Sequence, residues 1–140
     1  MKKNYKQHLS KINTLIFDVD GVLTNGYVTV MPDGELVRQM NIKDGYALRT
    51  ATSVGLRICV ISGGNNKGVK VRLKNLGIQE IFMGVNDKIK YYNKLAAKYD
   101  FQVVFGRSWY SRHSSLVLAS RRDSSVCSNR ASCQGLVEVV

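Results

Sequence analysis

The sequence predicts an α/β protein in which a Rossmann-like parallel sheet carries helices on its faces. Short apolar runs rich in β-branched residues alternate with longer segments in which apolar and charged residues recur at helical intervals. Glycine, asparagine and aspartate separate most of these segments, as expected of turns between regular elements. Strands that alternate with helices along a chain form parallel sheets. A chain of 140 residues with 44% hydrophobic residues can bury the core of about one such domain.

The first strand is predicted within the apolar run at residues 12–17, and it ends at Asp18 and Asp20. Residues 26–40 then alternate on either side of a Pro-Asp-Gly turn, which predicts a β-hairpin. A loop is expected at 41–45, followed by a helix that Asp44 caps and that runs to about Val54. A buried strand is expected at 56–61, and the helix after it ends at Leu76, before Gly77. A short strand at 78–83, a helix that begins at Asn86 and Asp87 and ends near Tyr99, and a strand at 101–105 complete the predicted elements.

Composition changes sharply near residue 103. Residues 103–140 contain no lysine but five arginines and nine serines, together with two of the three cysteines. Periodicity is weak there, apart from one short apolar run at 116–119. A flexible tail and a change of reading frame near residues 102–106 both account for this shift. We expect residues 1–106 to form the core domain, with its C-terminal part incomplete, and residues 107–140 to form an aberrant tail of low order.

The formal charge of +11 fits either nucleic-acid binding or attraction of an acidic metabolite. Most lysines recur at helical intervals, which indicates solvated helix faces, and no nucleic-acid-binding motif accompanies them. No apolar run approaches the roughly 20 residues of a membrane span, and no signal peptide is recognisable. Irregularly spaced cysteines do not indicate a disulfide framework, and Cys59 is expected to be buried. We expect a cytoplasmic protein that binds neither nucleic acid nor membrane.

The end of the first strand carries the most distinctive chemistry. Two carboxylates one residue apart, after a buried strand, lie where open α/β sheets bind ligands. Asp18 and Asp20 would repel each other unless a cation or a proton lay between them. Mg²⁺ is the simplest such cation, because it binds carboxylate and phosphate oxygens. Alone, an Asp-x-Asp-Gly string is more simply a strand followed by a turn.

Two further features follow later strands. Ser62 and Gly63 end the second buried strand and open a helix, so a hydroxyl and backbone N–H groups can hold phosphate oxygens there. Alone, this pair is more simply a turn with an N-cap serine. Lys88 begins a helix, where a cation opposes the helix dipole, and this favours a role toward a ligand. A solvated surface lysine is the simpler alternative.

Together these features resemble the haloacid dehalogenase superfamily of phosphatases. Residues 17–24 (Phe-Asp-Val-Asp-Gly-Val-Leu-Thr), the Ser-Gly pair and Lys88 resemble three successive motifs of that superfamily, in the same order. The spacing after the first motif leaves room for the hairpin but for no cap domain. Residues 41–46 and the segment 71–78 make the chain similar to the capless branch, whose members hydrolyse sugar acid phosphates.

The resemblance implies a role for each of these residues. Asp18 would be the nucleophile that forms an aspartyl-phosphate, and Asp20 would protonate the leaving oxygen and then deprotonate water. The Asp18 carboxylate and the Asp20 backbone carbonyl would hold Mg²⁺. Ser62, the Gly63 amide and Lys88 would stabilise charge on the transferring phosphoryl group. The residues implied to contact a small phosphorylated sugar acid are Asp20, Asn41, Ile42, Lys43, Asp44, Gly45, Arg49 and Arg72. A homotetramer is also implied, with each hairpin covering a neighbour's site.

Two positions depart from the family's pattern. Gly64 stands where the family commonly has an arginine. Arg107 and Ser108 follow Gly106, where the family's fourth motif has Gly-Asp-Asp and supplies the remaining magnesium ligand. An arginine at that position would repel Mg²⁺ and impair activity. The alternatives that stay open are a non-catalytic binding or oligomerising scaffold with the same fold, and a basic nucleic-acid-binding domain.

Overall fold

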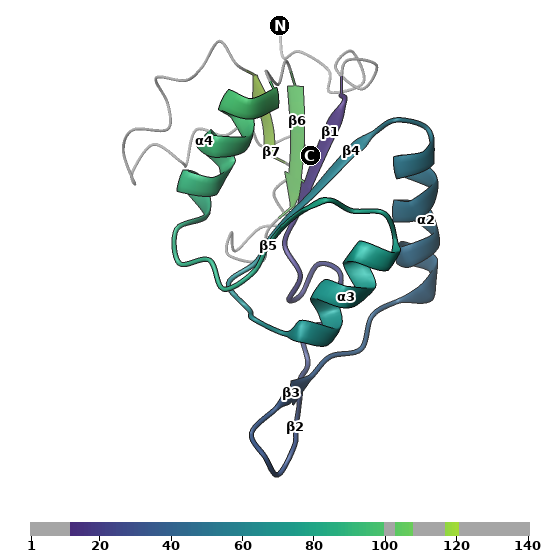
Figure 1. Ribbon diagram of the computed structural model, residues 1–140, viewed down its shortest axis with the longest axis vertical. Coiled ribbons are helices and arrows are strands. Elements are labelled where there is room, and N and C mark those ends of the chain that lie inside the picture. The colour runs from purple at the N-terminus through teal and green to yellow at the C-terminus, as the bar shows by residue number, and fades with distance from the viewer. Residues whose placement is uncertain (1–11, 100–102, 108–116, 121–140) are drawn as a thin grey trace, which may run out of the picture.

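The computed structural model describes residues 12–99, 103–107 and 117–120 of the chain. At its centre lies a five-stranded sheet in the order β5-β4-β1-β6-β7 (Figure 1). The strands are β1 (Thr14–Phe17), β4 (Arg57–Ile61), β5 (Glu80–Phe82), β6 (Val103–Arg107) and β7 (Val117–Ser120). The first four run parallel, whereas β7 pairs with β6 in antiparallel fashion. The predicted α/β fold with a parallel sheet is confirmed, and the strand that carries the two aspartates is its central one.

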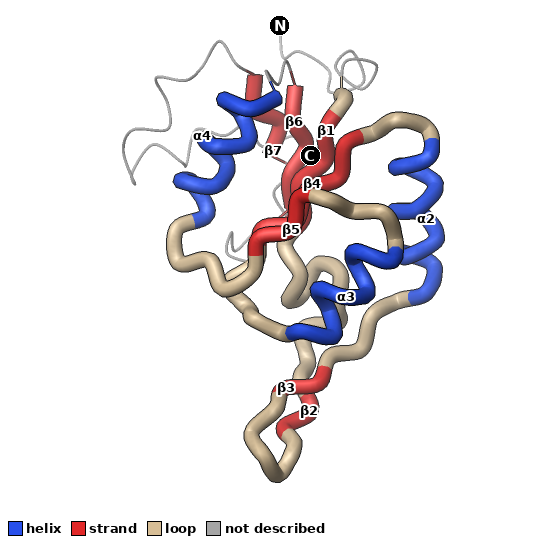
Figure 2. Tube along the Cα trace, viewed as in Figure 1, coloured by secondary structure: helices blue, strands red, loops and turns tan. Residues whose placement is uncertain are grey.

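Helices cover both faces of this sheet (Figures 1 and 2). One face carries α2 (Ile42–Ser53) and α3 (Lys67–Asn75), and the other carries α4 (Lys88–Tyr99). Because β1, β4, β5 and β6 run parallel, their carboxyl ends all point toward the same edge of the sheet, whereas β7 runs the opposite way. Asp18, after β1, and Ser62, after β4, lie at this edge.

Alternation along β4 supplies the cores on both faces of the sheet, because successive side chains of a strand point to opposite sides. Ile58 and Val60 pack into the cluster beneath α2 and α3, whereas Cys59 and Ile61 pack into the cluster beneath α4. Cys59 is fully buried, as the sequence predicts. Burial also raises the pKa of its thiol to about 12, so Cys59 is an inert core residue.

The starts of the helices agree with the sequence in two cases and differ in one. The side chains of Asn66 and Asp87 accept hydrogen bonds from the first turns of α3 and α4. For α2 the prediction was wrong, because Asn41 and not Asp44 is the cap. The Asn41 side chain accepts a hydrogen bond from the Lys43 N–H at 2.8 Å, and Asp44 lies within the first turn. The segment predicted as a loop at 41–45 is therefore mostly helical.

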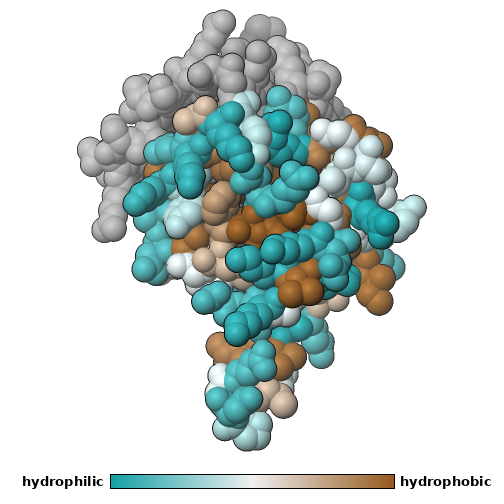
Figure 3. Space-filling model, in the orientation of Figure 1, coloured by the Kyte–Doolittle hydropathy of each residue, from teal (hydrophilic) through white to brown (hydrophobic). Residues whose placement is uncertain are grey.

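The predicted hairpin projects from the body of the molecule (Figure 1). Its strands, β2 (Thr29–Val30) and β3 (Leu36–Val37), are antiparallel and shorter than the alternation at 26–40 suggests. The side chains of both strands are exposed, so no core packs against the hairpin to stabilise a longer pair of strands. Apolar side chains are therefore visible on the projecting hairpin (Figure 3).

The last two strands extend the sheet beyond the predicted core boundary at residue 106. β6 includes Arg107, and its register places this residue beside Phe17 of β1. β7 covers most of the short apolar run at 116–119. Residues 101–102 of the strand predicted at 101–105, and most of the predicted tail at 107–140, lie outside the described residues. Within the part of the chain that the structure describes, no helix has the length and apolar character needed to cross a bilayer.

Candidate active site

Asp18 follows the last residue of β1 and is 8% exposed. Its Oδ1 atom accepts a hydrogen bond from the Val19 N–H at 2.8 Å, which fixes the carboxylate against its own backbone. Its Oδ2 atom accepts a hydrogen bond from Lys88 Nζ. A buried carboxylate is costly unless it is paired, and this pair supplies the compensation. The strand end thus presents one oriented carboxylate beside a cation.

The loop after β1 is held by the carbonyl of Val19. This oxygen accepts hydrogen bonds from the N–H groups of Val22, Leu23 and Thr24 at 3.2, 2.9 and 3.1 Å. Val19 itself is 1% exposed and belongs to the core, so the side chain between the two aspartates is directed away from solvent. Gly21 adopts φ 74°, a conformation that glycine reaches without strain. The tight loop keeps Asp20 close to the strand end.

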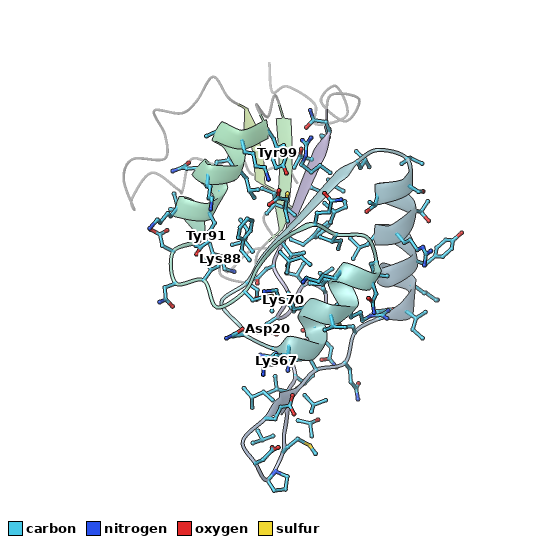
Figure 4. The ribbon with its side chains drawn as sticks, in the orientation of Figure 1. Asp20, Lys67, Lys70, Lys88, Tyr91 and Tyr99 are labelled. Atoms are coloured by element: carbon cyan, nitrogen blue, oxygen red, sulfur yellow. The ribbon has the colours of Figure 1, made fainter. Side chains whose placement is uncertain are left out.

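Lys88 is the first residue of α4, and its side chain is 34% exposed. Asp87 caps the helix through hydrogen bonds from the N–H groups of Ile89 and Lys90 at 3.0 and 3.3 Å. The lysine therefore does not cap the helix but reaches across to Asp18. Figure 4 shows Lys88 and Asp20 beyond the carboxyl ends of the strands, on the side toward the hairpin.

Ser62 follows β4, the strand beside β1, and is 1% exposed. Its Oγ atom accepts a hydrogen bond from the Gly64 N–H at 3.2 Å. Two backbone hydrogen bonds, from Val85 N–H to the Ser62 carbonyl and from Gly84 N–H to the Gly64 carbonyl, each 3.0 Å, join this loop to the one that leads into α4. The serine loop and the loop before Lys88 therefore form one connected unit.

Asp20 forms an ion pair that the sequence did not predict. Arg38, just after β3, donates from Nε to Asp20 Oδ1 at 2.7 Å and from Nη2 to Asp20 Oδ2 at 3.2 Å. These hydrogen bonds raise the pKa of the Arg38 guanidinium, against the opposing effect of its desolvation. A Cβ atom on Gly64 would lie 3.0 Å from Asp20 Oδ2 and 3.7 Å from Ser62 Oγ. The side chains of Asp20 and Ser62 therefore both lie close to Gly64.

Two hollows flank this cluster. One, of about 410 Å³, is lined by Arg38, Asn66 and Arg72 together with Ile42 and other residues of the hairpin and α3. The other, of about 350 Å³, is lined by Asn41 and Asp44 together with residues of the loop after β1. Four of the residues predicted to contact substrate therefore line the two hollows beside the aspartates.

Gly45 is buried within α2 and faces Arg72 of α3. A Cβ atom at this position would lie 2.7 Å from Arg72 Nη2, so only glycine leaves room for the guanidinium in its present place. Lys43 and Arg49 differ from the other predicted substrate residues. Both are exposed on α2, and neither lines either hollow.

A magnesium ion fits the oxygen donors at the end of β1. The Asp18 carboxylate and the Asp20 backbone carbonyl are hard ligands, and Mg²⁺ is commonly bound by one or two carboxylates with water and substrate phosphate completing its shell. Among the described residues, no three or more His, Cys, Asp or Glu side chains are grouped to hold a metal. Held by these two donors, such an ion would take its remaining ligands from water and substrate phosphate.

No family model matches the sequence. The fold is nevertheless similar to that of a hydrolase of the HAD superfamily (subfamily III A) from Legionella pneumophila. The TM-score is 0.61 at 31% identity, and the match covers 64% of this chain and 50% of that one. The fold of this chain is thus similar to that of a haloacid dehalogenase superfamily hydrolase.

More particular similarity is to 3-deoxy-D-manno-octulosonate 8-phosphate (KDO 8-phosphate) phosphatases. The enzyme of that name from Yersinia pestis is 33% identical over 91 residues, 65% of this chain and 49% of the relative. The chain thus spans about half the length of the curated relatives it matches. A Moraxella catarrhalis KDO 8-phosphate phosphatase, solved with magnesium, phosphate and KDO, has a TM-score of 0.68 at 26% identity, covering 73% of this chain and 60% of that one. This chain is homologous to these phosphatases over the matched segment.

Proposed function

We propose that this chain is a Mg²⁺-dependent phosphatase that hydrolyses a sugar acid phosphate such as KDO 8-phosphate through an aspartyl-phosphate. The observation that carries the proposal is the hydrogen bond between Lys88 and the buried carboxylate of Asp18. A carboxylate oriented at a strand end beside a cation is suited to attack an electrophilic phosphorus whose oxygens carry negative charge. The homology to phosphatases supports the same reaction.

In the proposed reaction, an Asp18 oxygen forms a bond to phosphorus while the bond from phosphorus to the sugar oxygen breaks. Asp20 gives its proton to that leaving oxygen. Water then attacks the aspartyl-phosphate, Asp20 accepts its proton, and phosphate leaves with the Asp18 carboxylate restored. Ser62, the Gly63 N–H and Lys88 face the transferring group and stabilise its charge. Mg²⁺, held by Asp18 and the Asp20 carbonyl, would supply neutralisation of the repulsion between carboxylate and phosphate.

The hollows beside the aspartates support the proposed substrate class. A sugar acid carries a carboxylate as well as its phosphate, and a guanidinium matches a carboxylate in shape and charge. Arg72 lines the larger hollow, and Asn41 and Asp44, which can bond sugar hydroxyls, line the smaller one. We assign these residues, with Ile42, Lys43, Gly45 and Arg49, to substrate contact. The magnesium, phosphate and KDO bound to the Moraxella catarrhalis relative support this class.

The exposed hairpin supports a homotetramer in which it covers a neighbouring site. Tyr27 is 78% and Val30 67% exposed, and such apolar exposure favours burial against another surface. A covering hairpin would also enclose the hollow beside Arg38. Sedimentation or light scattering of the purified chain tests this assembly, because a monomer at micromolar concentration would contradict it.

A non-catalytic scaffold is the second candidate, and one observation favours it. The register between β6 and β1 places Arg107 beside Phe17, one residue before Asp18. At this register position the sequence has Arg107 and Ser108, where the family resemblance implies the remaining magnesium ligand. We therefore expect reduced activity, and we expect that replacing Arg107 and Ser108 by Asp-Asp, with a C-terminal segment grafted from a relative, raises turnover by orders of magnitude. Unchanged turnover in that chimera would favour the scaffold.

Release of inorganic phosphate from KDO 8-phosphate tests the proposed function. We expect turnover that requires Mg²⁺, that is absent with EDTA and that is lost in Asp18→Asn. Lys94→Gln, a change of one charge on the exposed side of α4, is the control variant and should keep the parental rate. Salt-sensitive binding of RNA or DNA without turnover would instead favour a nucleic-acid-binding domain.

A further inference from the structure

The ion pair between Arg38 and Asp20 joins the hairpin to the candidate acid–base residue. Two nitrogens of one guanidinium contact both oxygens of one carboxylate, at 2.7 and 3.2 Å. A bidentate pair of this kind fixes the rotation of the carboxylate as well as its position. The Arg38 side chain is 8% exposed, although the hairpin that carries it projects into solvent. The guanidinium is thus part of the site rather than of the surface.

The hairpin is anchored beside this pair at a second point. Arg38 Nη1 donates to the Leu36 carbonyl at 2.8 Å, and Asn66 Nδ2 donates to the same oxygen at 3.0 Å. Asn66 also caps α3, through its Oδ1 and the Val69 N–H at 2.9 Å. The base of the hairpin is therefore tied both to Asp20 after β1 and to the loop after β4.

Gly64 leaves the space that the ion pair occupies. A Cβ atom there would lie 3.0 Å from Asp20 Oδ2 and 3.2 Å from Arg38 Nη2, so even a methyl group would require the paired side chains to shift by a few tenths of an ångström. The φ angle of Gly64 is not positive, and the requirement is for space rather than for an unusual backbone conformation. Gly64 thus leaves the space that the Arg38 guanidinium occupies beside Asp20.

We propose that Arg38 is the positioning residue for Asp20, so that the hairpin supplies the guanidinium that orients the acid–base carboxylate and Gly64 provides the room for it. The catalytic consequence rests on the proposed phosphatase function, whereas the coupling between hairpin and Asp20 does not. Arg38 acts through Asp20 and is not itself a catalytic residue.

Steady-state kinetics on KDO 8-phosphate test the catalytic consequence. Loss of orientation lowers the rate of proton transfer more than it weakens substrate binding, so Arg38→Gln should lower kcat by about tenfold to a hundredfold and change KM by less than about threefold. Arg38→Lys, which keeps one charged donor, should restore part of kcat. Gly64→Ala should lower kcat in the same direction but by less, because it shifts the pair without removing it, and Lys94→Gln should have no effect. An unchanged kcat in Arg38→Gln would overturn the inference and leave the proposed function standing.

Hydrogen–deuterium exchange tests the coupling without turnover. Asp20→Ala should speed exchange of the hairpin amides at 26–40 by severalfold, and Arg38→Gln by about tenfold, because it also removes the bond to the Leu36 carbonyl. The double variant should exchange no faster than Arg38→Gln, because that change already removes the ion pair. Effects that multiply in the double variant would overturn the inference. If the parental chain releases no phosphate while the exchange effects are non-additive, the proposed function fails and the structural coupling holds.

Discussion

Lys88, the first residue of α4, donates a hydrogen bond to Asp18, the residue that follows β1. The two are separated by 70 positions in the sequence, and the contact forms because α4 begins at the same sheet edge at which β1 ends. Its effect is to pair a carboxylate that is 8% exposed with a cation that remains partly accessible. This contact gives Lys88 two expected roles, toward the resting carboxylate and toward the phosphoryl group.

Replacing Lys88 tests the catalytic role of this contact. Lys88→Gln should lower kcat/KM by about a hundredfold, because it removes a preorganised charge where negative charge develops. Lys90→Gln, an exposed lysine in the same turn of α4, is the matched control and should keep the parental value. Phosphate-release kinetics provide the measurement. Equal effects of the two changes would indicate a general loss of positive potential instead of a specific contact.

Gly45→Ala should separate substrate binding from stability. The added methyl would lie 2.7 Å from Arg72 Nη2, the mobile end of a long side chain, so Arg72 should shift while the fold remains. Alanine is favoured over glycine within a helix by about 1 kcal/mol, which offsets the local crowding. We expect an unchanged or slightly higher Tm and a severalfold higher KM for a sugar acid phosphate. A normal KM would remove Arg72 from substrate recognition.

Asn66 has two hydrogen-bonding functions that substitutions can separate. Asn66→Asp keeps the cap of α3 but loses the donor to the Leu36 carbonyl, so it should loosen the hairpin with little loss of stability. Asn66→Ala loses both and should lower the free energy of unfolding by about 1–2 kcal/mol. Urea denaturation measures stability, and hydrogen–deuterium exchange of the hairpin amides measures the effect of losing the bond to the Leu36 carbonyl. If the hairpin amides exchange equally fast in Asn66→Asp and in the parental chain, the hydrogen bond from Asn66 to the Leu36 carbonyl does not hold the hairpin in place.

Glu80 provides a pH-dependent test at the opposite end of the sheet. Hydrogen bonds from Lys98, at 2.6 Å, and from Tyr99 lower the pKa of the Glu80 carboxyl. Tyr99 lies near the end of α4 remote from Lys88 (Figure 4). A lowered pKa contributes stability that is complete above the ordinary range of a glutamate and is lost as pH falls through the folded-state pKa.

Glu80→Gln should therefore lower the free energy of unfolding by about 1–2 kcal/mol at neutral pH. The difference from the parental chain should shrink as the pH falls below the ordinary range of a glutamate and through the lowered folded-state pKa of Glu80, where the carboxyl becomes protonated. Urea denaturation over a pH series measures it. Glu35→Gln, at an exposed hairpin position, is the control. A difference that persists at low pH would show that the contacts do not depend on the charge of Glu80.

The sheet and the positions of Asp18, Ser62 and Lys88 follow from local sequence. Buried strands are recognisable as apolar runs, and parallel strands bring their carboxyl ends to one edge whatever lies between them. Asp87 could be recognised as a helix cap because it precedes a long periodic segment. The catalytic residues that the resemblance implies therefore lie where strand order alone would place them.

Two features required tertiary information. A glycine is unfavourable within a helix, so the segment around Gly45 resembled a loop. In the structure the helix begins earlier, after the Asn41 cap, and Gly45 leaves room for the Arg72 guanidinium. Arg38 lies in a hairpin and contacts an aspartate 18 positions away, a pairing that no local pattern encodes. The sequence showed Gly64 in place of the family's arginine, but nothing in the sequence connected that glycine with Arg38.

Acid-quenched mass spectrometry of the chain mixed with KDO 8-phosphate and Mg²⁺ tests the central claim most directly. The account predicts one phosphoryl group on the peptide that contains Asp18, formed within the first turnover, acid-stable enough to detect and absent in Asp18→Asn. Asp20→Asn should retain the label longer, because water is no longer deprotonated. Phosphate release at the parental rate from a chain that never carries the label, or from Asp18→Asn, would contradict the assignment of Asp18 as nucleophile.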